Sequence, residues 1–208
     1  MRYIIILFFI FLTSCEKTPL FNIVGQKENS SKDFVIEKML DLEKITRVGS
    51  VYGTPGASPD NPGTADNPPG AHNGIDICAD EGTEFIACVN GVVVALREGH
   101  DNFGATKEVE IRYNSEYSII YLFEPPKEIK VKLGEVVYKG DVIGYLGKRD
   151  VGAGVHFGIK KNGEWRCPVP YLTKEVRKKL NDVYHKEWHP PDCPQNLCNH
   201  PEHQSLFE

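Results

Sequence analysis

Short apolar runs that alternate with polar positions occupy the middle of the chain, which is the pattern of half-buried β-strands. From residue 72 to residue 171 these runs are rich in β-branched or aromatic residues and are separated by Gly, Asn or Asp. The clearest are GVVVALR (91–97), KEVEIRY (107–113), YSIIYLF (117–123), DVIGYLG (141–147) and GVHFGIK (154–160). The pattern predicts a mainly β domain, an antiparallel sandwich or open barrel.

Two other stretches have helical spacing. Val35, Met39 and Leu42 recur on one helical face, so residues 32–47 are expected to form an N-terminal helix. Residues 173–184 predict a short charged helix, which is followed by a tail rich in Pro, His and Cys that ends the chain at residue 208. Both helices would flank the β domain.

Turn-forming residues mark the connections. Residues 53–71 hold five prolines and four glycines, which is typical of a long loop. Long ordered loops in compact domains are often functional and are otherwise flexible. The sequence KNGE (161–164) predicts a hairpin turn after the last long strand.

The N-terminus has the features of an export signal. One Arg precedes a ten-residue apolar run, Tyr3 to Leu12, which is too short to span a bilayer but has the length of a signal-peptide core. The run ends in Leu-Thr-Ser-Cys, which resembles a bacterial lipobox. We expect a signal peptide over residues 1–14, a diacylated Cys15 and a polar tether over residues 15–31, with an ordinary secretory signal as the alternative. This predicts a lipid-anchored protein of the bacterial cell envelope, in a leaflet that stays open.

The net charge of the chain limits the classes of binding partner that we expect. With 24 Lys and Arg against 29 Asp and Glu, the formal net charge is −5. Nucleic acid and anionic membrane surfaces are therefore disfavoured as partners. The only membrane contact that we expect is the lipid anchor.

Export also implies an oxidising compartment. Besides Cys15 the chain has five cysteines, an odd number, so at most two disulfides can form within it. Cys193 and Cys198 are a plausible close pair, and Cys78 and Cys88 flank one turn and could also meet. The spacing leaves the pairing open.

A histidine and a carboxylate stand close together where the β-rich region begins. His72 precedes Asp76 by four residues, a span of roughly 13 Å in a straight strand. Two ligands of one metal ion must each lie about 2 Å from it, so the chain would have to bend between them. Asn73-Gly74 is a pair that permits such a bend.

A third ligand would have to come from elsewhere, and His156 is the candidate. It lies within an apolar strand, on the face opposite Val155 and Phe157. A lone histidine in a strand is more often a hydrogen-bonded structural residue than a ligand. The neighbouring sequence motifs favour the interpretation of His156 as a ligand.

Four sequence motifs, in the same order as in that family, resemble those of the lysostaphin/LytM-type zinc endopeptidases, which cut peptide cross-links in bacterial cell walls. They are VGSVYGTP (48–55), HNGIDICADEGTEFIACVNGVVV (72–94), LGEVVYKGDVIGYLG (133–147) and GVHFGIKKNGEWRCPVPYL (154–172). The resemblance implies a domain over about residues 48–172 with the LytM, or duplicated hybrid motif, fold. It also implies that His72, Asp76 and His156 bind zinc and leave a fourth position open for water.

The chain departs from the family pattern at two other histidines. The final family motif is His-x-His, and its first position here is Gly154. A second catalytic histidine normally follows a Tyr in a Tyr-x-His-Leu phrase, and Phe123 falls in its place. Groups that orient the water, accept its proton or stabilise the developing anion are therefore missing.

Substitutes for the missing histidines are weakly indicated. The candidates are His100, Tyr113, Tyr121, Glu124 and Asp150, which lie in or near key strands. A solvated loop residue is the plainer interpretation of His100.

The tail offers a separate candidate site. Cys193, Cys198, His200 and His203 have a spacing that can bind zinc, although a Cys193–Cys198 disulfide is the plainer interpretation in an exported protein.

These features support three hypotheses of function. The first is a zinc-binding, catalytically impaired domain that binds peptidoglycan peptides or regulates a cell-wall hydrolase. The alternative is an active zinc-dependent peptidoglycan endopeptidase with a non-standard base. The third is zinc storage or sensing through the tail.

Overall fold

The computed structural model describes residues 34–64, 67–150, 152–187, 189 and 193–207. The predicted signal peptide, Cys15 and the tether lie outside the described residues. Among the helices that are described, none combines the length and the apolar character needed to cross a membrane.

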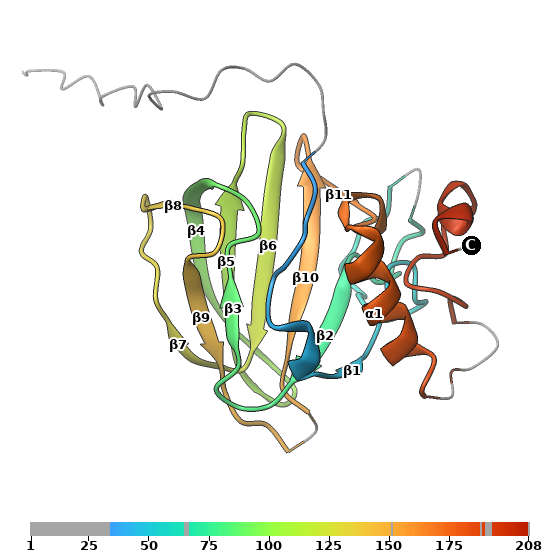
Figure 1. The fold of residues 1–208 in the computed structure, drawn as a ribbon, viewed down its shortest axis with the longest axis horizontal. Helices are drawn as coiled ribbons and strands as arrows, with labels where there is room; N and C mark the ends of the chain where they lie inside the picture. The colour runs from blue at the N-terminus through green and yellow to red at the C-terminus, as the bar shows by residue number, and fades with distance from the viewer. Residues whose placement is uncertain (1–33, 65–66, 151, 188, 190–192, 208) are drawn as a thin grey trace, which may run out of the picture. The chain divides into compact units, whose positions relative to one another are not determined.

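Two antiparallel sheets form the body of the described chain, and the predicted mainly β fold is confirmed (Figure 1). The larger sheet has the strand order β1-β2-β10-β6-β5-β4-β8, with β11 paired to β10, and the smaller one has the order β3-β9-β7. The strands are β1 (Ile45–Val48), β2 (Ile75–Ala79), β3 (Glu84–Ile86), β4 (Gly91–Asp101), β5 (Gly104–Arg112), β6 (Tyr117–Glu124), β7 (Pro126–Ile129), β8 (Val136–Val137), β9 (Val142–Leu146), β10 (Gly154–Lys161) and β11 (Glu164–Arg166).

The five predicted apolar runs all form strands, namely β4, β5, β6, β9 and β10. The predicted hairpin turn joins β10 to β11, and both of its central residues, Asn162 and Gly163, have positive φ, at 51° and 82°. Asn and Gly tolerate this conformation best, which explains the sequence signal.

The predicted N-terminal helix is wrong for the part of residues 32–47 that the structure describes. Ile36 instead forms a parallel bridge with Leu172, and the chain continues through a short 3-10 turn, η1 (Leu42–Lys44), into β1. Val35, which a helix would bury beside Met39, is 54% exposed. Backbone bonds to the end of the domain have overridden a weak local periodicity.

The predicted C-terminal helix is confirmed as α1 (Lys174–Tyr184). The hydroxyl of Thr173 accepts a hydrogen bond from the Val176 N–H and caps its start. The buried residues of the helix are Val176, Leu180, Val183 and Tyr184. The helix packs next to β1 (Figure 1), and two further 3-10 helices are η2 (Val169–Tyr171) and η3 (Pro201–Phe207).

Strand register divides the large sheet into an inner and an outer face. Across β2, β10 and β6, Ile77 pairs with Val155, which pairs with Phe123; these are the inner-face residues and are fully buried. The Phe123 ring lies 5.7 Å from the ring of Phe85 in the small sheet, so the core lies between the two sheets. Because side chains alternate along a strand, Asp76, Cys78, Gly154, His156, Leu122 and Glu124 belong to the outer face.

The disulfide joins Cys167, after β11, to Cys198 in the tail. Neither of the pairs that the sequence suggested is formed, because Cys198 is bound to Cys167, and Cys78 and Cys88 are in no disulfide. Cys78 lies on the outer face of β2, whereas Cys88 is buried in the core, where its N–H donates to the Tyr121 hydroxyl. Sequence proximity could not show that the two thiols lie on different sides of the sheet.

We expect the Cys167–Cys198 bond to hold the tail against the domain. Cys198→Ser should lower the free energy of unfolding by about 3 kcal/mol, since the bond closes a loop with a sequence separation of 31 residues. The measurements are denaturant unfolding and peptide mapping without reductant; recovery of a Cys193–Cys198 peptide would contradict the pairing.

Candidate metal centre

The segment before β2 holds His72 in place through its backbone. The His72 N–H donates to Thr54 O at 2.8 Å, and its carbonyl accepts from Gly53 N–H and from the Asn67 side-chain amide, both at 2.9 Å. All three partners belong to the long Pro- and Gly-rich loop, and Asn67 is buried. The loop therefore positions the first candidate ligand.

The chain bends at Gly74, as the sequence predicts. A Cβ at this residue would lie 2.6 Å from His156 Cε1 and 2.5 Å from Phe157 O. Such distances leave no room for a side chain, so a glycine is required where His72 turns back over β2.

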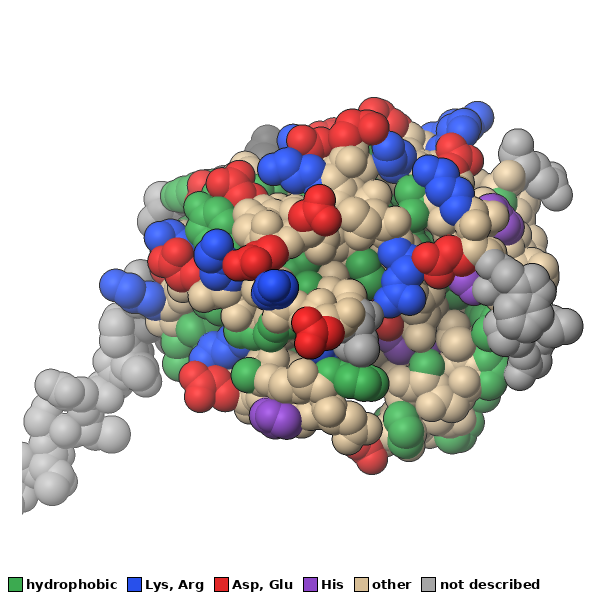
Figure 2. Space-filling model, turned by 90° about the horizontal axis from the view of Figure 1, so that it is seen from below, with side chains coloured by type: hydrophobic (Ala, Val, Ile, Leu, Met, Phe, Trp, Pro, Cys, Tyr) green, Lys and Arg blue, Asp and Glu red, His purple; other side chains and the backbone are tan. Residues whose placement is uncertain are grey.

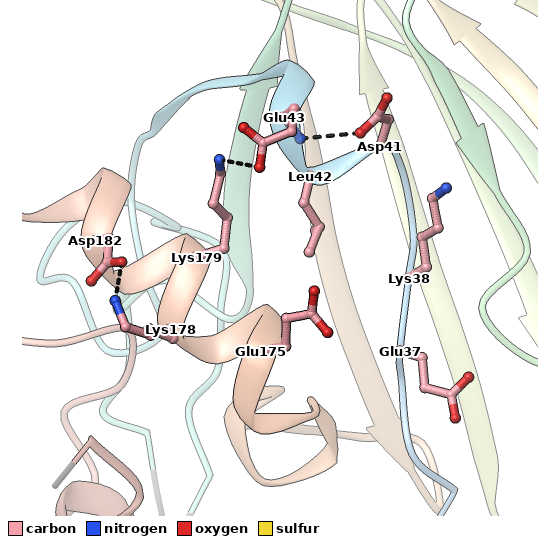
Figure 3. A pocket seen from close by; sticks show the side chains of 9 residues that line it. All are labelled: Glu37, Lys38, Asp41, Leu42, Glu43, Glu175, Lys178, Lys179 and Asp182. Carbon is pink, nitrogen blue, oxygen red and sulfur yellow. Dashed lines mark hydrogen bonds and ion pairs between the residues drawn. The ribbon is translucent and has the colours of Figure 1, made fainter.

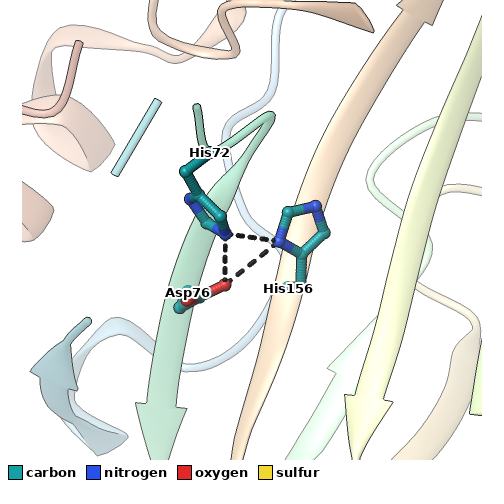
Figure 4. A group of neighbouring side chains, drawn as sticks. All are labelled: His72, Asp76 and His156. Carbon is teal, nitrogen blue, oxygen red and sulfur yellow. Dashed lines mark hydrogen bonds and ion pairs between the residues drawn. The ribbon is translucent and has the colours of Figure 1, made fainter. Parts of the chain in front are cut away.

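Pairing of β2 with β10 supplies the other two groups, because Asp76 and His156 are direct partners across the strands. His72 Nε2 lies 2.9 Å from His156 Nδ1, and Asp76 Oδ1 lies 3.1 Å from each of these nitrogens. Figure 4 shows the three side chains directed at one another from the two elements. The structure thus brings together the three residues that the sequence suggested.

The chemistry of this triangle fits a divalent metal ion. A neutral imidazole carries only one N–H, so two facing nitrogens and a carboxylate oxygen at these distances have too few protons to satisfy one another. A zinc ion bound tetrahedrally at about 2 Å would hold its ligands roughly 3.3 Å apart, close to the distances observed. Among the described residues this is the one group of three or more His, Cys, Asp or Glu that could hold a metal.

Electrostatics keep the carboxylate ionised. Burial by itself would raise the pKa of Asp76, but the charge of His72 and hydrogen bonds from both imidazoles bring the pKa well below its usual range. Burial lowers the pKa of His156, which favours the neutral, ligating form of the ring. Both groups are therefore in the protonation state that metal binding needs.

An open cavity of about 430 Å³ lies on the outer face beside Asp76. The large sheet contributes Asp76, Cys78, Glu124 and Gly154, and the C-terminal segment contributes Tyr184, Glu187, His189 and Cys193. Arg149 and Phe103 also line it, with the Arg149 guanidinium 5.2 Å from the centre of the Phe103 ring. Of the three candidate ligands, Asp76 is the one that lines this cavity.

Phe123 does not face this cavity. Its ring lies in the core between the sheets, and the outer-face positions of β6 at this level are Leu122 and Glu124. Gly154 does belong to the outer face, between Cys78 on β2 and Glu124 on β6. On the outer face at this level, β10 offers no side chain at Gly154, and the neighbouring strand offers the carboxylate of Glu124.

Glu124 is the one predicted substitute that lines the cavity. Burial first, and then the nearby carboxylates of Asp76 and Asp101, raise its pKa to about 7, although Arg149 opposes the shift. Arg149 lies 3.8 Å from it and is itself bound to Asp101. Arg149, like Asn67, was missed by sequence analysis, because nothing local distinguishes a buried arginine in a loop from a solvated one.

The other predicted substitutes lie elsewhere. The Tyr121 hydroxyl is buried in the core, where it donates to Ile86 O at 3.2 Å. Tyr113 packs against Phe34. His100, at the end of β4, and Asp150 are exposed and do not line the cavity.

The candidate metal site in the tail does not form among the described residues. Cys198 is in the disulfide with Cys167, and no metal-binding group there includes Cys193, His200 or His203.

A second hollow, between residues 37–43 and α1, has no comparable chemistry (Figure 3). Its charges pair with each other, as in Lys179 with Glu43 and Lys178 with Asp182. On the face seen in Figure 2, acidic and basic side chains are likewise interspersed. Such surfaces are typical of solvated faces.

Comparison with known proteins agrees with this geometry. The sequence matches Peptidase family M23 over residues 70–168, which include all three candidate ligands. It is 30% identical to Stage II sporulation protein Q of Bacillus subtilis (strain 168), over 70% of this chain and 53% of that protein. It is 32% identical to an uncharacterized metalloprotease of Haemophilus influenzae (strain ATCC 51907 / DSM 11121 / KW20 / Rd), over 50% of this chain and 21% of that protein.

A solved structure shares the fold. The structure of the SpoIIQ-SpoIIIAH pore forming complex aligns with a TM-score of 0.50 and 24% identity, covering 68% of this chain and 92% of that one. The chain spans about half or less of the length of the curated relatives named above. The family match, the fold and the converging His, Asp and His residues lead to one conclusion: residues 70–168 of this chain are a Peptidase family M23 domain, of the LytM/lysostaphin type.

Proposed function

We propose that this protein is a zinc-binding cell-wall domain of a lipid-anchored envelope protein that binds peptidoglycan peptides and hydrolyses them poorly or not at all. The observation that carries the proposal is the convergence of His72, Asp76 and His156 beside an open cavity. Zinc held there would polarise a peptide carbonyl and lower the pKa of a bound water. The predicted lipid anchor would hold the domain at the membrane, where wall peptides or a wall hydrolase are within reach.

Impairment follows from what surrounds the ligands. Gly154 offers no side chain where the family pattern has a histidine, and Phe123 faces the core. A general acid–base group contributes about 10²–10⁴ in rate, and an oxyanion donor about 10²–10³. Losses of this size suit a domain that binds wall peptides, or that binds and regulates another wall hydrolase.

A second candidate function is slow peptide hydrolysis with a non-standard base. The observation that favours it is Glu124, a carboxylate that lines the same cavity as Asp76. The two candidates share the metal site and differ only in whether a proton acceptor acts beside it.

Zinc content tests the ligand set. The wild-type protein should bind one equivalent of zinc, and His72→Ala and His156→Ala should each lose most of it, because two ligands hold the ion far less tightly than three. His100→Ala, an exposed histidine outside the cavity, is the matched control and should retain the metal. The measurement is elemental analysis after dialysis, and full zinc content in both ligand variants would refute the assignment.

The loop amide offers a more selective test of the site. Asn67→Ala removes the hydrogen bond to the His72 carbonyl and should weaken zinc binding by about tenfold, as is usual for groups that orient a ligand. Asn114→Ala removes a comparable side-chain-to-backbone contact in the turn before β6 and should not change it. Competition with a chromogenic chelator gives both affinities; equal values would show that the loop does not position the ligand.

Purified cell-wall sacculi decide between the two candidate functions. Under the proposal, zinc-loaded protein should sediment with sacculi and release few or no new amino termini. A chelator should reduce the binding. Rapid, chelator-sensitive release of amino termini would instead establish the second candidate function. Binding to sacculi that is unchanged by the chelator would contradict a role for zinc.

A further inference from the structure

We propose that Glu124 is the proton acceptor and donor of this site, supplied from β6 in place of the missing histidines. The inference rests on the second candidate function, in that it names the residue through which this site hydrolyses peptides. The evidence for it is the register of three strands and the residues that line the cavity. This evidence does not depend on the rate of the reaction.

Strand register places Glu124 next to the metal ligands. It is the direct partner of Gly154 across β6 and β10, so the two residues share the outer face. His156 is two residues further along β10, which makes Glu124 and His156 diagonal neighbours about 7–8 Å apart. The glutamate side chain is long enough to extend from β6 towards His156. Glu124 and Asp76 also line the same cavity.

Other groups of the cavity are less suited to take a proton. The Sγ of Cys78 would lie 3.3 Å from a Cβ at position 154, but burial raises the pKa of this thiol, which keeps it neutral. His189 is stacked on Tyr184 with ring centres 3.8 Å apart, and its Nε2 lies 2.8 Å from the Tyr184 carbonyl oxygen. Arginines stay protonated.

Arg149 acts as a positioning residue for Glu124. Its side chain is only 8% exposed, its Nη2 is bound to both carboxylate oxygens of Asp101, and its Nη1 lies 3.8 Å from Glu124 Oε2. At that distance the guanidinium attracts the carboxylate without a short hydrogen bond, so the oxygen keeps a lone pair for a proton.

The charged groups around Glu124 suit a proton acceptor at neutral pH. Burial, Asp76 and Asp101 raise the pKa of the Glu124 carboxyl, while Arg149 and His72 lower it, and the result is about 7. A base works best when its pKa lies near the working pH. The carboxylate form, which accepts the proton, predominates above that value.

The proton balance of the reaction is simple. A water oxygen adds to the peptide carbonyl carbon while one water proton passes to an oxygen of Glu124. The C–N bond then breaks, and the same proton passes from Glu124 to the leaving nitrogen. Glu124 ends the cycle as it began, and the products are one carboxyl and one amino terminus.

The test compares Glu124→Gln with Glu116→Gln, a matched carboxamide at an exposed glutamate outside the cavity. Release of amino termini from sacculi should fall about 100-fold in Glu124→Gln at unchanged zinc content, and less than twofold in Glu116→Gln. The wild-type rate should rise with pH, because the carboxylate form of Glu124 is the one that accepts the proton. Equal rates for wild type and Glu124→Gln would overturn the inference.

Binding of a phosphinic peptide gives a readout that needs no turnover. A protonated Glu124 would donate a hydrogen bond to the phosphinate, so the Kd of the zinc-loaded wild type should rise as the pH rises, and in Glu124→Gln it should not. A Kd for the wild type that is independent of pH would overturn the inference alone. Failure of the wild type to bind zinc would overturn the proposed function as well.

Discussion

The antiparallel pairing of β2 with β10 is the contact on which the rest of the site depends. It sets Asp76 directly opposite His156, so two of the candidate ligands are positioned by backbone hydrogen bonds rather than by flexible loops. Because side chains alternate along a strand, a slip of one residue would turn both groups into the core. Fully buried residues on the inner face, such as Ile77 and Val155, make that slip costly. The strand register that packs the core therefore also fixes the geometry of the site.

The same alternation explains which sequence predictions succeeded. The strand runs and the Asn162-Gly163 turn could be predicted because their signals are local. The proximity of His72, Asp76 and His156 could be predicted because a family resemblance connected distant motifs, and their role as ligands stays a prediction. The helix over residues 32–47 failed because its apolar spacing was weaker than the tertiary pairing of Ile36 with Leu172. The disulfide could not be predicted because Cys167 and Cys198 are 31 residues apart in the sequence and are brought together only by the tertiary fold.

Phe123 shows most clearly what a motif alignment leaves out. By sequence it stands where the family pattern has a catalytic histidine, which suggests a direct loss of function. In the structure its ring packs against Phe85, and the neighbouring Glu124 is the residue on the outer face. An alignment counts positions, whereas a sheet assigns each position to a face, and chemistry depends on the face.

Gly154 can be understood in the same terms. A Cβ there would come within 3.1 Å of Ile77 O and 3.3 Å of Cys78 Sγ, closer than most real contacts. A histidine at this position would have to displace the thiol, so the glycine and Cys78 are sterically matched. Loss of a large side chain from β10 also leaves room on that row for a group from an adjacent strand. Glu124 is the ionisable residue that β6 offers there. In the role that we propose for it, a carboxylate would move the proton that an imidazole moves in the family pattern.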